Sequence, residues 1–593
     1  MPRWMKHQAV QLAVIIGVTL FAYGNIFYNQ FAWDDPEFLV QWKTLQRWDS
    51  VPQLLAGELP ARHVGVYRPV RSVIYLAARQ LLGGNVIGYH VHSLLVHLAA
   101  VVLVYVVTRQ LTRQQMMAFF AALLFGVHPV HTEAVTYLTT NFDLWGIVLF
   151  LGALSAYLRG QEQPKPWRLV SWTLALLAAF TYEITLVFPL VVFFHALLWR
   201  KDRLLRAVQV ALPYILVSLS YVAVRAMVIG SAIRSAPLLA VTPWLHALTV
   251  VKIFAQYALM TVLPLTQTVY PPLASARGLA DPTVLLALGL LAVLVMLGVL
   301  AVRKNTPLVA WSVGLFFLAL LPVAQIIPAK IIMAERYLYL PSFGFCLLLA
   351  WLLQRFLNRS QLGVWLLLAV LVGGYGTLTW QRNRDWRSDA TLWAKTVSQV
   401  PADARAHHNL GAAFSRQGNY PQALASLRTA VALDPSYAEG YATLGQVLAA
   451  TEQYDAAVAA FQHALQLEPR YLDAIRNLGD AYLAQEQFTA AIAQYRAYLG
   501  YEPNDPAVYN NLGLALLSAG AYPDAAASFS GALQRDPSLS PARLGLALAF
   551  IGQQRYQEAQ ALLTEIVAAD PDNEVAVEQL QRLEQLLRSG PLP

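Results

Sequence analysis

The sequence predicts an all-α protein in two parts, a polytopic membrane domain followed by an α-solenoid. Hydrophobic residues make up 57% of its 593 residues and charged residues only 13%, a composition too apolar for a soluble chain of this length. Long apolar runs continue to about residue 385, and beyond that point Pro, Gly and aromatic residues recur with a fixed period. We therefore expect a membrane domain at residues 1–385 and a solenoid at residues 386–593.

The membrane domain is expected to cross the bilayer about eleven times, as judged from the apolar stretches. The candidate spans are 8–28, 88–108, 115–127, 142–158, 169–182, 184–198, 207–229, 281–302, 306–327, 337–355 and 362–380. No small-residue cleavage site follows the first stretch, so we expect a retained helix. A further apolar stretch, 247–264, is predicted to be re-entrant or interfacial, because a full span there would separate Arg303 and Lys304 from the other basic loops.

The basic residues predict the orientation of these spans. They form clusters that all fall on one side, which the positive-inside rule makes cytoplasmic. These clusters are Arg3/Lys6, Arg109/Arg113, Arg159/Lys165/Arg168, Arg200/Lys201/Arg203/Arg206, Arg303/Lys304 and Arg355/Arg359. An odd number of spans then places the C-terminal part outside. The clusters also explain the net charge of +8, so the bilayer is the expected partner and nucleic acid is not.

Cysteine usage bears on the compartment. The chain has one cysteine, Cys346, which excludes a disulfide framework or a thiol-based zinc site within one chain. The absence of disulfides and of a large signal region favours a bacterial inner membrane over an endoplasmic reticulum. We therefore expect the outer side of the domain to face the periplasm.

Unusual polar residues gather on the predicted outer face. They are Asp34-Asp35, Tyr67-Arg68-Pro69, the turn from His128 to Glu133, Tyr182-Glu183, and the segment from Lys330 to Arg336. Ionisable groups close to the hydrocarbon are costly unless they are paired or used. Their convergence therefore indicates a functional site, and the alternative is that they are ordinary polar residues at helix ends.

The C-terminal part repeats every 34 residues, the period of tetratricopeptide repeats. The recurring residues are Pro401, Pro435, Pro469, Pro503, Pro537 and Pro571, the aromatics Tyr420, Tyr454, Phe488, Tyr522 and Tyr556, and Gly411, Gly445, Gly479 and Gly513. We expect five repeats over about 402–571, with Ala547 in place of Gly in the fifth, and then a capping helix. Such a solenoid offers a concave surface to an extended peptide or a partner, and the alternative is a spacer.

The chain resembles the transmembrane and tetratricopeptide repeat-containing O-mannosyltransferases, membrane glycosyltransferases of the GT-C class. The resemblance rests on the repeats and on four strings: Phe31-Ala-Trp-Asp-Asp35, Tyr67-Arg-Pro-Val70, Phe125-Gly-Val-His-Pro-Val-His-Thr-Glu-Ala-Val135 and Ala334-Glu-Arg-Tyr-Leu-Tyr-Leu-Pro341. It implies transfer of a mannose-like sugar from a polyprenyl phosphate to Ser or Thr of a protein, which the repeats would present.

Two departures from the family pattern remove a cation each. Thr140-Asn141-Phe142-Asp143 stands where the family has Gly-Arg-Ala-Asp, and Tyr182-Glu183 stands where it often has Lys-Glu. Each lost cation would have faced a phosphate or an acidic partner. The departures leave the identity of the donor and of the acceptor open. They bear less on the class of reaction.

The chemistry requires a base for the acceptor hydroxyl and cations for the departing phosphate. The resemblance implies that an acid in the first outer loop is the base of an inverting displacement. We assign Asp34 or Asp35 to this role and favour Asp34, because Pro36 fixes the backbone directly after the second carboxylate. Adjacent like charges also raise the proton affinity of one partner. Alternatively, the pair holds a divalent cation, Mg²⁺ or Mn²⁺.

Arg336 is the first candidate for the phosphate, with Arg68 and Lys330 behind it, because a guanidinium matches phosphate oxygens. The alternative for Arg336 is a structural ion pair with Glu335. His128 and His131 are candidates to donate hydrogen bonds to phosphate or sugar. The carboxylates expected to orient them or to contact the sugar are Glu133, Asp143, Glu183 and Glu335. Zinc is not expected, because His-Pro-x-His lacks the i, i+4 pairing of helical zinc sites.

Other chemistries lack their usual motifs. The sequence has no P-loop, no Gly-x-Gly-x-x-Gly after a strand and no Gly-x-Ser-x-Gly elbow. Two alternatives remain beside protein glycosylation. One is transfer to a lipid-linked glycan or polysaccharide, and the other is a non-catalytic membrane scaffold that displays the repeats.

Overall fold

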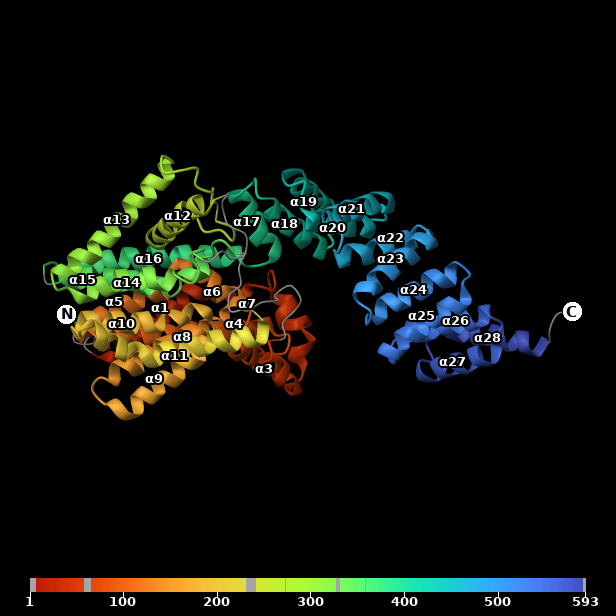
Figure 1. The fold of residues 1–593 in the computed structure, drawn as a ribbon, viewed down its shortest axis with the longest axis horizontal. Helices are drawn as coiled ribbons and strands as arrows, with labels where there is room; N and C mark the ends of the chain where they lie inside the picture. Colours follow the sequence, from red (N-terminus) through yellow and green to blue (C-terminus); the bar gives the residue numbers. More distant parts are fainter. Residues whose placement is uncertain are drawn as a thin grey trace. The chain divides into compact units, whose positions relative to one another are not determined.

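The computed structural model describes residues 7–57, 66–230, 242–271, 273–326, 331–357 and 359–589, and every regular element in these ranges is helical. The chain forms two compact units, Met1–Val400 and Pro401–Pro593 (Figure 1). The predicted all-α class with a repeat solenoid at the C-terminus is confirmed.

The first unit is a bundle of long apolar helices with short helices at one end. Its α-helices are α1 (Gln8–Tyr23), α2 (Val51–Leu55), α3 (Pro69–Leu82), α4 (Val86–Thr112), α5 (Gln115–Gly126), α6 (Thr132–Thr136), α7 (Leu138–Asn141), α8 (Leu144–Arg159), α9 (Pro164–Ala179), α10 (Phe188–Trp199), α11 (Leu204–Ile229), α12 (Pro243–Val262), α13 (Pro282–Arg303), α14 (Pro307–Leu320), α15 (Pro341–Leu357), α16 (Gln361–Asp385) and α17 (Asp389–Gln399). Several of them begin with Pro, whose fixed φ and missing N–H suit the first turn of a helix.

The membrane character predicted from composition is confirmed. Seven helices in the described residues are long and apolar enough to cross a bilayer, or eight if α5 and Pro129–Thr136, which are bent by 54°, form one broken span. Shorter apolar helices at Glu183–Trp199, Pro307–Leu320 and Pro341–Leu357 accompany them. The count of about eleven crossings stays a prediction.

The chain folds back on itself after α12. Lys252 Nζ donates to the carbonyl of Ala274 at 2.7 Å, and the amide of Ala276 donates to Thr249 Oγ1 at 3.0 Å. Because Lys252 also lies 3.9 Å from Asp281, the residue before α13, that helix begins beside the first half of α12. The length of α12 alone would allow a span. Whether this stretch crosses the bilayer or is re-entrant stays a prediction.

Basic loops lie together at one end of the first unit. Arg109 at the end of α4 donates to Gln8 at the start of α1, and Arg113 pairs with Glu162 after α8 at 3.1 Å. Arg200 after α10 donates to Gln161 in the same region. Helices that start or end here run to the opposite end of the unit, where the candidate polar residues lie.

Close helix contacts explain why small residues occur inside the bundle. A Cβ atom added to Gly344 in α15 would collide with the backbone carbonyl of Ser312 in α14, and one added to Gly126 in α5 would collide with Thr19 of α1. Small residues let helix backbones approach in this way where the surroundings are apolar.

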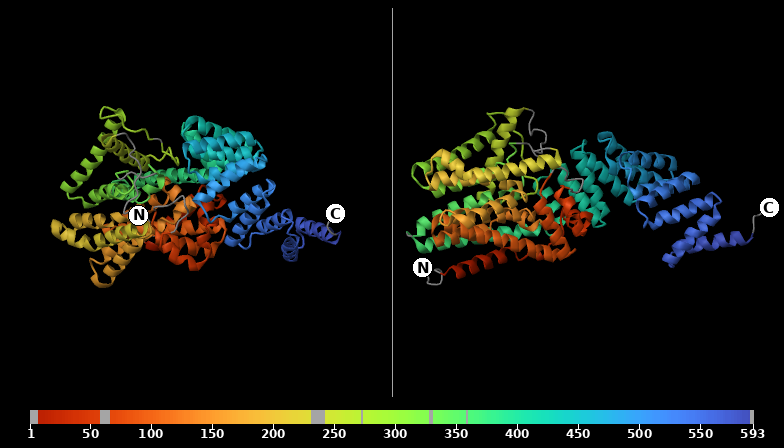
Figure 2. Two further views of the ribbon diagram at one scale, coloured as in Figure 1. Left: turned by 45° about the vertical axis from the view of Figure 1, so that its right-hand side comes forward. Right: turned by 60° about the horizontal axis from the view of Figure 1, so that its bottom comes forward.

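The second unit is a stack of helix pairs. Between residues 401 and 589 the pairs are α18/α19 (Ala404–Arg416, Tyr420–Leu433), α20/α21 (Ala438–Ala450, Tyr454–Leu467), α22/α23 (Leu472–Ala484, Phe488–Tyr501), α24/α25 (Pro506–Ser518, Tyr522–Arg535) and α26/α27 (Ser540–Gly552, Tyr556–Ala569), followed by α28 (Glu574–Ser589). Figure 2 shows the pairs following one another along the unit. In three of the pairs the recurring glycine, Gly445, Gly479 or Gly513, lies against a ring: a Cβ on Gly479 would be 2.8 Å from the ring of Tyr495.

The two units divide later than the composition changes. The apolar sequence ends with α16 at Asp385, whereas the first unit extends to Val400. The reason is α17, whose Trp393 is buried against Trp33 and Tyr270 of the first unit. Although its sequence is polar, α17 is thus held in the first unit by aromatic contacts with residues far away in the sequence.

Candidate functional site

Two of the predicted site residues, Asp34 and Arg336, are held by one short stretch of chain, α6 and the residue that follows it. Glu133 in this helix accepts a hydrogen bond from the backbone N–H of Arg336 at 3.0 Å and forms an ion pair with its guanidinium. Tyr137, four residues later and directly after the end of α6, donates its hydroxyl to Asp34 Oδ2 at 3.0 Å. Asp34 and Arg336, far apart in sequence, are therefore attached to one short stretch of chain, residues 133–137.

The two adjacent carboxylates occupy different environments. Asp35 is only 1% exposed, and its Oδ1 accepts from the backbone N–H of Thr139 at 2.6 Å and from the hydroxyl of Thr139 at 2.7 Å. Its Oδ2 accepts from the N–H of Ala32 at 3.0 Å. Asp34 is partly exposed. Asp35 therefore ties the loop after α1 to α7, and Asp34 is the carboxylate that an incoming group can reach.

Burial and, to a smaller extent, the charge of Asp34 raise the pKa of Asp35 to about 7, while the bonds from Ala32 and Thr139 oppose the shift. The repulsion between neighbouring carboxylates that we expected from the sequence is thus present, but desolvation is the larger cause. The three donors around Asp35 suit its ionised form, which accepts hydrogen bonds and donates none.

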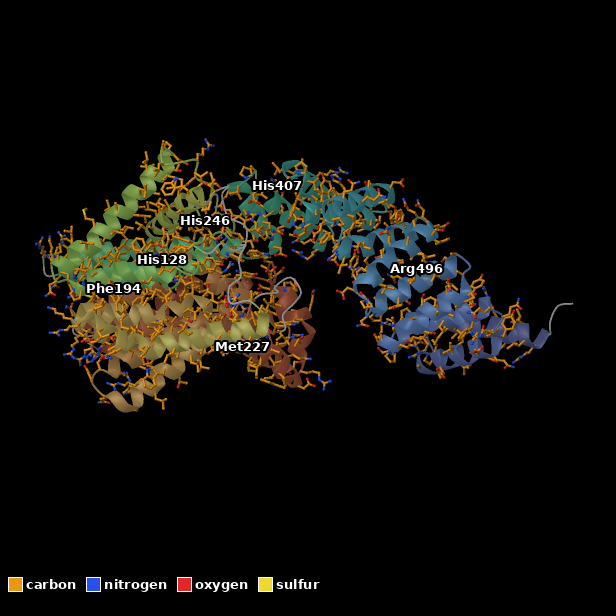
Figure 3. All side chains as sticks on the ribbon, in the orientation of Figure 1. His128, Phe194, Met227, His246, His407 and Arg496 are labelled. Carbon is orange, nitrogen blue, oxygen red and sulfur yellow. The ribbon has the colours of Figure 1, made fainter. Side chains whose placement is uncertain are left out.

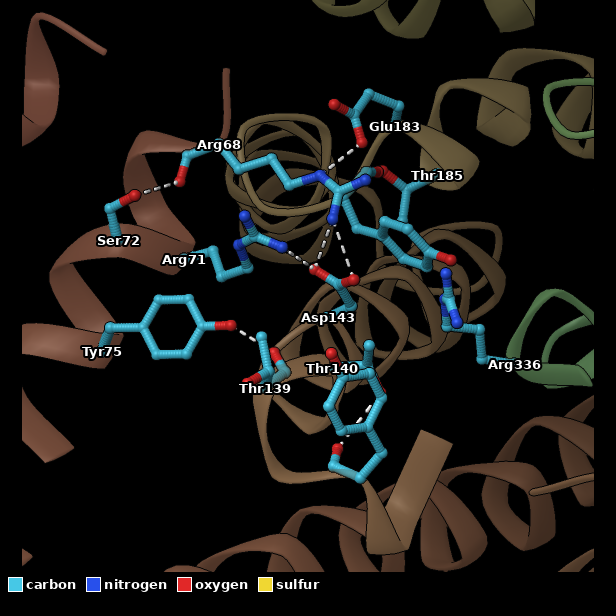
Figure 4. A network of polar contacts seen from close by, with 12 residues as sticks. Arg68, Arg71, Ser72, Tyr75, Thr139, Thr140, Asp143, Glu183, Thr185 and Arg336 are labelled. Carbon is cyan, nitrogen blue, oxygen red and sulfur yellow. Dashed lines mark hydrogen bonds and ion pairs between the residues drawn. The ribbon is translucent and has the colours of Figure 1, made fainter. Parts of the chain in front are cut away.

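A second polar network surrounds Asp143 (Figure 4). Arg68 Nη1 donates to both carboxylate oxygens of Asp143 at 2.9 Å, and Arg68 Nε donates to Glu183 Oε2 at 2.6 Å. Arg71 Nη1 donates to Asp143 Oδ1 at 2.9 Å, and the Tyr221 hydroxyl donates to Glu183 Oε1 at 3.3 Å. Two cations and two carboxylates thus balance each other here.

The two departures from the family pattern lie at this network. Asn141 is fully buried, and neither polar atom of its side chain has a hydrogen-bond partner among the described residues. Arg71 supplies a second cation to Asp143 from α3. Tyr182 packs under the guanidinium of Arg68, whose central carbon lies 4.9 Å from the ring centre. Asp143, Arg68 and Arg336 all lie close enough to the Tyr182 phenol for their charges to act on it. The ring therefore lies between the network around Asp143 and Arg336.

Arg336 does not pair with its neighbour Glu335. Glu335 is fully buried and accepts from Arg382 Nη2 at 3.1 Å, while Arg382 Nη1 donates to Asp385 at 3.1 Å. The structural ion pair considered for Arg336 therefore involves Glu133 instead. Lys330, the third candidate for the phosphate, lies outside the described residues.

The predicted histidines point into the helix bundle. His128 and His131 are fully buried, and Figure 3 labels His128 within the helices of the first unit. His128 Nε2 lies 3.1 Å from the carbonyl of Thr261, and His131 Nε2 lies 2.7 Å from Ser342 Oγ. Glu133 and Asp143 bond to arginines rather than to these rings, so the contacts do not support the idea that they orient the histidines.

The carboxylates and histidines of the site are not arranged as a cluster of metal ligands in the described part of the chain. Within the described ranges, no group of three or more His, Cys, Asp or Glu side chains is placed to hold a metal ion. At Asp34-Asp35 both oxygens of the second carboxylate are engaged by Ala32 and Thr139. Asp35 is thus engaged by the fold rather than held open for a divalent cation.

An aromatic stack stands beside Asp34. The ring of Tyr137 lies between Trp33 and Trp386, with centroid distances of 5.2 Å on both sides and interplanar angles of 10° and 18°. Trp33 has a φ of 57°, a left-handed conformation that is strained for a bulky residue. Its N–H donates to Asp389 of α17. The backbone just before Asp34 is thus fixed by a strained residue, two rings and a carboxylate.

Sequence reasoning missed four of these residues. Arg71 directly follows the Tyr67-Arg-Pro-Val70 string, and Tyr137 lies one helical turn after Glu133, so both had a local signal. Arg382 and Trp386 had none, because helix-end residues of these types are common and their partners come from distant segments.

The fold and the polar cluster define a polytopic helical membrane protein that carries tetratricopeptide repeats. The repeat assignment is confirmed by family models: the tetratricopeptide repeat matches residues 438–471, 476–540 and 516–583, and the TPR repeat matches 414–451.

The resemblance inferred from the sequence strings is confirmed by curated relatives. The protein O-mannosyl-transferase F38B6.6 of Caenorhabditis elegans is 26% identical over 453 residues, covering 72% of this chain and 63% of that protein. The human protein O-mannosyl-transferases TMTC3 and TMTC1 are 25% and 26% identical over 72% of this chain, covering 51% and 55% of their lengths. The chain therefore spans between about half and two thirds of the length of these relatives.

Solved structures resemble parts of the chain. The structure described as "YrrB: a TPR protein with an unusual peptide-binding site" is 23% identical, with a TM-score of 0.30, and covers 32% of this chain and 99% of its own. MamA from Desulfovibrio magneticus RS-1 is 22% identical with a TM-score of 0.28, covering 29% and 96%.

Proposed function

We propose that this chain is a GT-C membrane glycosyltransferase that moves a mannose-like sugar from a polyprenyl phosphate to a Ser or Thr hydroxyl of an acceptor protein. The site would face the periplasmic side of a bacterial inner membrane. The observation that carries the proposal is the attachment of Asp34 and Arg336 to one short stretch of chain, through Tyr137 and Glu133. The names of the curated relatives support the same reaction class.

In this mechanism Asp34 is the general base. Its carboxylate takes the proton of the acceptor hydroxyl as that oxygen attacks the anomeric carbon of the sugar. The bond from this carbon to the phosphate oxygen breaks in the same displacement, and its electron pair leaves with the polyprenyl phosphate. The anomeric configuration is inverted. Tyr137 holds Asp34 in place by a hydrogen bond to one of its oxygens.

Arg336 is the cation for the departing phosphate. Its guanidinium is a planar fork with five N–H donors, and Glu133 engages one edge of it. The remaining donors match the oxygens of a phosphate that gains charge as the bond breaks. Arg68 is already bound by Asp143 and Glu183. We therefore assign Arg68 to a supporting position behind Arg336.

The proposal is tested by transfer from purified donors. The full chain in nanodiscs is supplied with a panel of polyprenyl-phosphate sugars and either a Ser/Thr-containing peptide or a lipid-linked glycan, and mass spectrometry detects the product. Mannose on the peptide supports protein glycosylation. Sugar on the glycan alone would support the polysaccharide alternative, and no transfer from any donor would support the scaffold.

Activity should fall below about pH 7. The pKa of Asp35 is raised from 3.8 to about 7, so this carboxyl is protonated below that pH and ionised above it. Protonation disfavours the three bonds that Asp35 accepts and loosens the loop that carries Asp34. We expect kcat/KM to rise with pH through about 7 and then to level off. Asp35→Asn cannot titrate, so kcat/KM of this variant should not rise with pH through about 7. The same rise in that variant would contradict the assignment.

Chelation should leave the reaction intact. Because Asp35 has no free oxygen for a metal ion, Asp34 would be the only ligand that the pair could offer. We expect EDTA treatment to leave the transfer rate within about twofold of the untreated protein. Loss of activity that Mg²⁺ or Mn²⁺ restores would instead support the divalent-cation alternative.

A further inference from the structure

Tyr182 is held by the fold through its backbone and its ring. Its N–H donates to the carbonyl of Ala178 at 3.0 Å, and its carbonyl accepts from the N–H of Thr185 at 3.0 Å and from the Thr185 hydroxyl at 2.7 Å. A Cβ added to Gly146 of α8 would lie 2.7 Å from the Cβ of Tyr182, so this glycine allows the close approach. Tyr182 is only 5% exposed, and the position of its ring is therefore fixed.

The hydroxyl of Tyr182 is the group that the fold does not use. It has no hydrogen-bond partner among the described residues, and it is not one of their polar atoms that are closed off from solvent. The hydroxyl of a buried tyrosine normally finds a partner, and an unpaired polar atom costs free energy comparable to a lost hydrogen bond. Phenylalanine would fill the same space without this cost. The hydroxyl therefore indicates contact with a ligand.

Arg336 brings further open donors to the same region. Its Nη1 and its backbone N–H are bonded to Glu133, whereas Nε and Nη2 have no hydrogen-bond partner in the part of the chain that the structure describes. Arg336 and Tyr182 lie close enough for each to act electrostatically on the other. In Figure 4 no dashed line joins Arg336 to the network around Asp143. One cation and one phenol thus present unused donors to a single ligand.

The acceptors around Tyr182 are already occupied. Asp143 accepts from Arg68 and Arg71 through its two oxygens. Glu183 accepts from Arg68 and from another tyrosine. Glu133 accepts from Arg336, as described above. The groups that remain for a ligand are donors, since a phenol is protonated at neutral pH. A sugar hydroxyl would find no free acceptor for its own proton here, whereas an anion has acceptors alone.

We propose that the Tyr182 hydroxyl donates a hydrogen bond to an oxygen of a phosphate group whose other oxygens are bound by Arg336. A phosphate has several acceptor oxygens, and two of them match the fork of a guanidinium, which leaves one for the phenol. The inference rests on the proposed function for the identity of this group, which would be the phosphate of the polyprenyl donor. Tyr182 is then a catalytic residue that acts on the leaving group beside Arg336.

The position of Tyr182 also gives Arg68 a role. The central carbon of its guanidinium lies 4.9 Å from the centre of the Tyr182 ring. Arg68 is held there by Asp143 and Glu183, at 2.9 and 2.6 Å. It therefore acts through Tyr182, as a positioning residue that supports the ring by a cation–π contact.

The test measures phosphate binding without sugar transfer. The full chain in nanodiscs is titrated with geranyl phosphate, a short isoprenoid phosphate, in an isothermal titration calorimeter, and nanodiscs without protein give the background. Tyr182→Phe removes one hydrogen bond to a charged group and should weaken binding about tenfold. Geraniol, which has no phosphate, should bind the unmodified protein and the variant equally.

Inorganic phosphate distinguishes a lipid headgroup from a free anion. If the site takes a lipid phosphate, geranyl phosphate should bind at least about tenfold more tightly than inorganic phosphate, because burial of its chain adds to the affinity. Equal affinities that both fall in Tyr182→Phe would support the contact between the phenol and the phosphate, but would assign it to a free anion.

Tyr89→Phe is the matched control. Tyr89 is fully buried, and its hydroxyl donates to the carbonyl of Gly83 at 3.2 Å. Loss of this hydroxyl should lower the thermal unfolding temperature and leave the Kd for geranyl phosphate within about twofold. Tyr182→Phe should show the opposite pattern, because its hydroxyl has no bond to lose among the described residues. A purely structural role of the Tyr182 hydroxyl would lower the unfolding temperature instead.

Equal Kd values for geranyl phosphate in the unmodified protein and in Tyr182→Phe would overturn the inference, as would the absence of phosphate binding to the unmodified protein. The transfer assay described above is read separately. Phosphate binding that depends on Tyr182, without sugar transfer from any donor, would contradict the proposed function and leave the inference standing.

Discussion

Asp34→Asn is expected to lower sugar transfer by about 10³-fold, within the range for loss of a general base. Asparagine keeps the shape of the side chain and can still accept a hydrogen bond from Tyr137, so the loop should remain in place. What it loses is the ability to take the proton of the acceptor hydroxyl. The effect should appear in kcat, with donor and peptide affinities near those of the unmodified protein. Single-turnover transfer of labelled mannose to a peptide measures it.

Asp35→Asn is the control that the structure offers. This residue neighbours Asp34 in sequence but is buried and bonded to Ala32 and Thr139. An asparagine there would place its side-chain NH₂ group, a donor, against the N–H donor of Ala32 or Thr139. This should destabilise the loop by about 1–3 kcal/mol and lower activity, because Asp34 would be misplaced. Its transfer rate at high pH should exceed that of Asp34→Asn by at least about tenfold. The reverse order, or more than a tenth of normal activity in Asp34→Asn, would assign the base elsewhere.

The repeats could be predicted from the sequence because their signal is local. Gly445, Gly479 and Gly513 recur where a ring of the paired helix lies too close for a Cβ, and the apolar runs of the first unit reflect a general requirement of the bilayer. Arg336 and Asp34 were also identified, because each lies in a distinctive string next to an apolar segment.

The pairings within the site could not be read from the sequence. Glu335 is the nearest carboxylate to Arg336 along the chain, yet Glu133 binds Arg336 and Arg382 binds Glu335. These pairs depend on how α6 and α16 pack against the segment before α15, and no local pattern encodes that packing. The different surroundings of Asp34 and Asp35 have the same origin, since their partners Tyr137 and Thr139 lie more than 100 residues further along the chain.

Arg336→Met is expected to lower both the stability of the fold and the rate of sugar transfer. The ion pair with Glu133 allows the two losses to be separated. The side chain of Glu133 is only 1% exposed and that of Arg336 is 10% exposed. Removal of the cation leaves a buried carboxylate without its partner, which costs about 3–5 kcal/mol. We expect a clear fall in the thermal unfolding temperature, measured by fluorescence-detected size-exclusion chromatography after heating.

The double variant Glu133→Gln/Arg336→Met tests the catalytic part. Without the buried charge, the protein should regain most of the lost unfolding temperature, because replacing a buried ion pair by uncharged groups is often close to neutral. Transfer should stay about 10²–10³-fold below normal, since the phosphate still lacks its donor. Glu133→Gln alone keeps the guanidinium and should retain much more activity than the double variant. If the double variant regains transfer together with stability, Arg336 serves the fold alone and the phosphate is held by another cation.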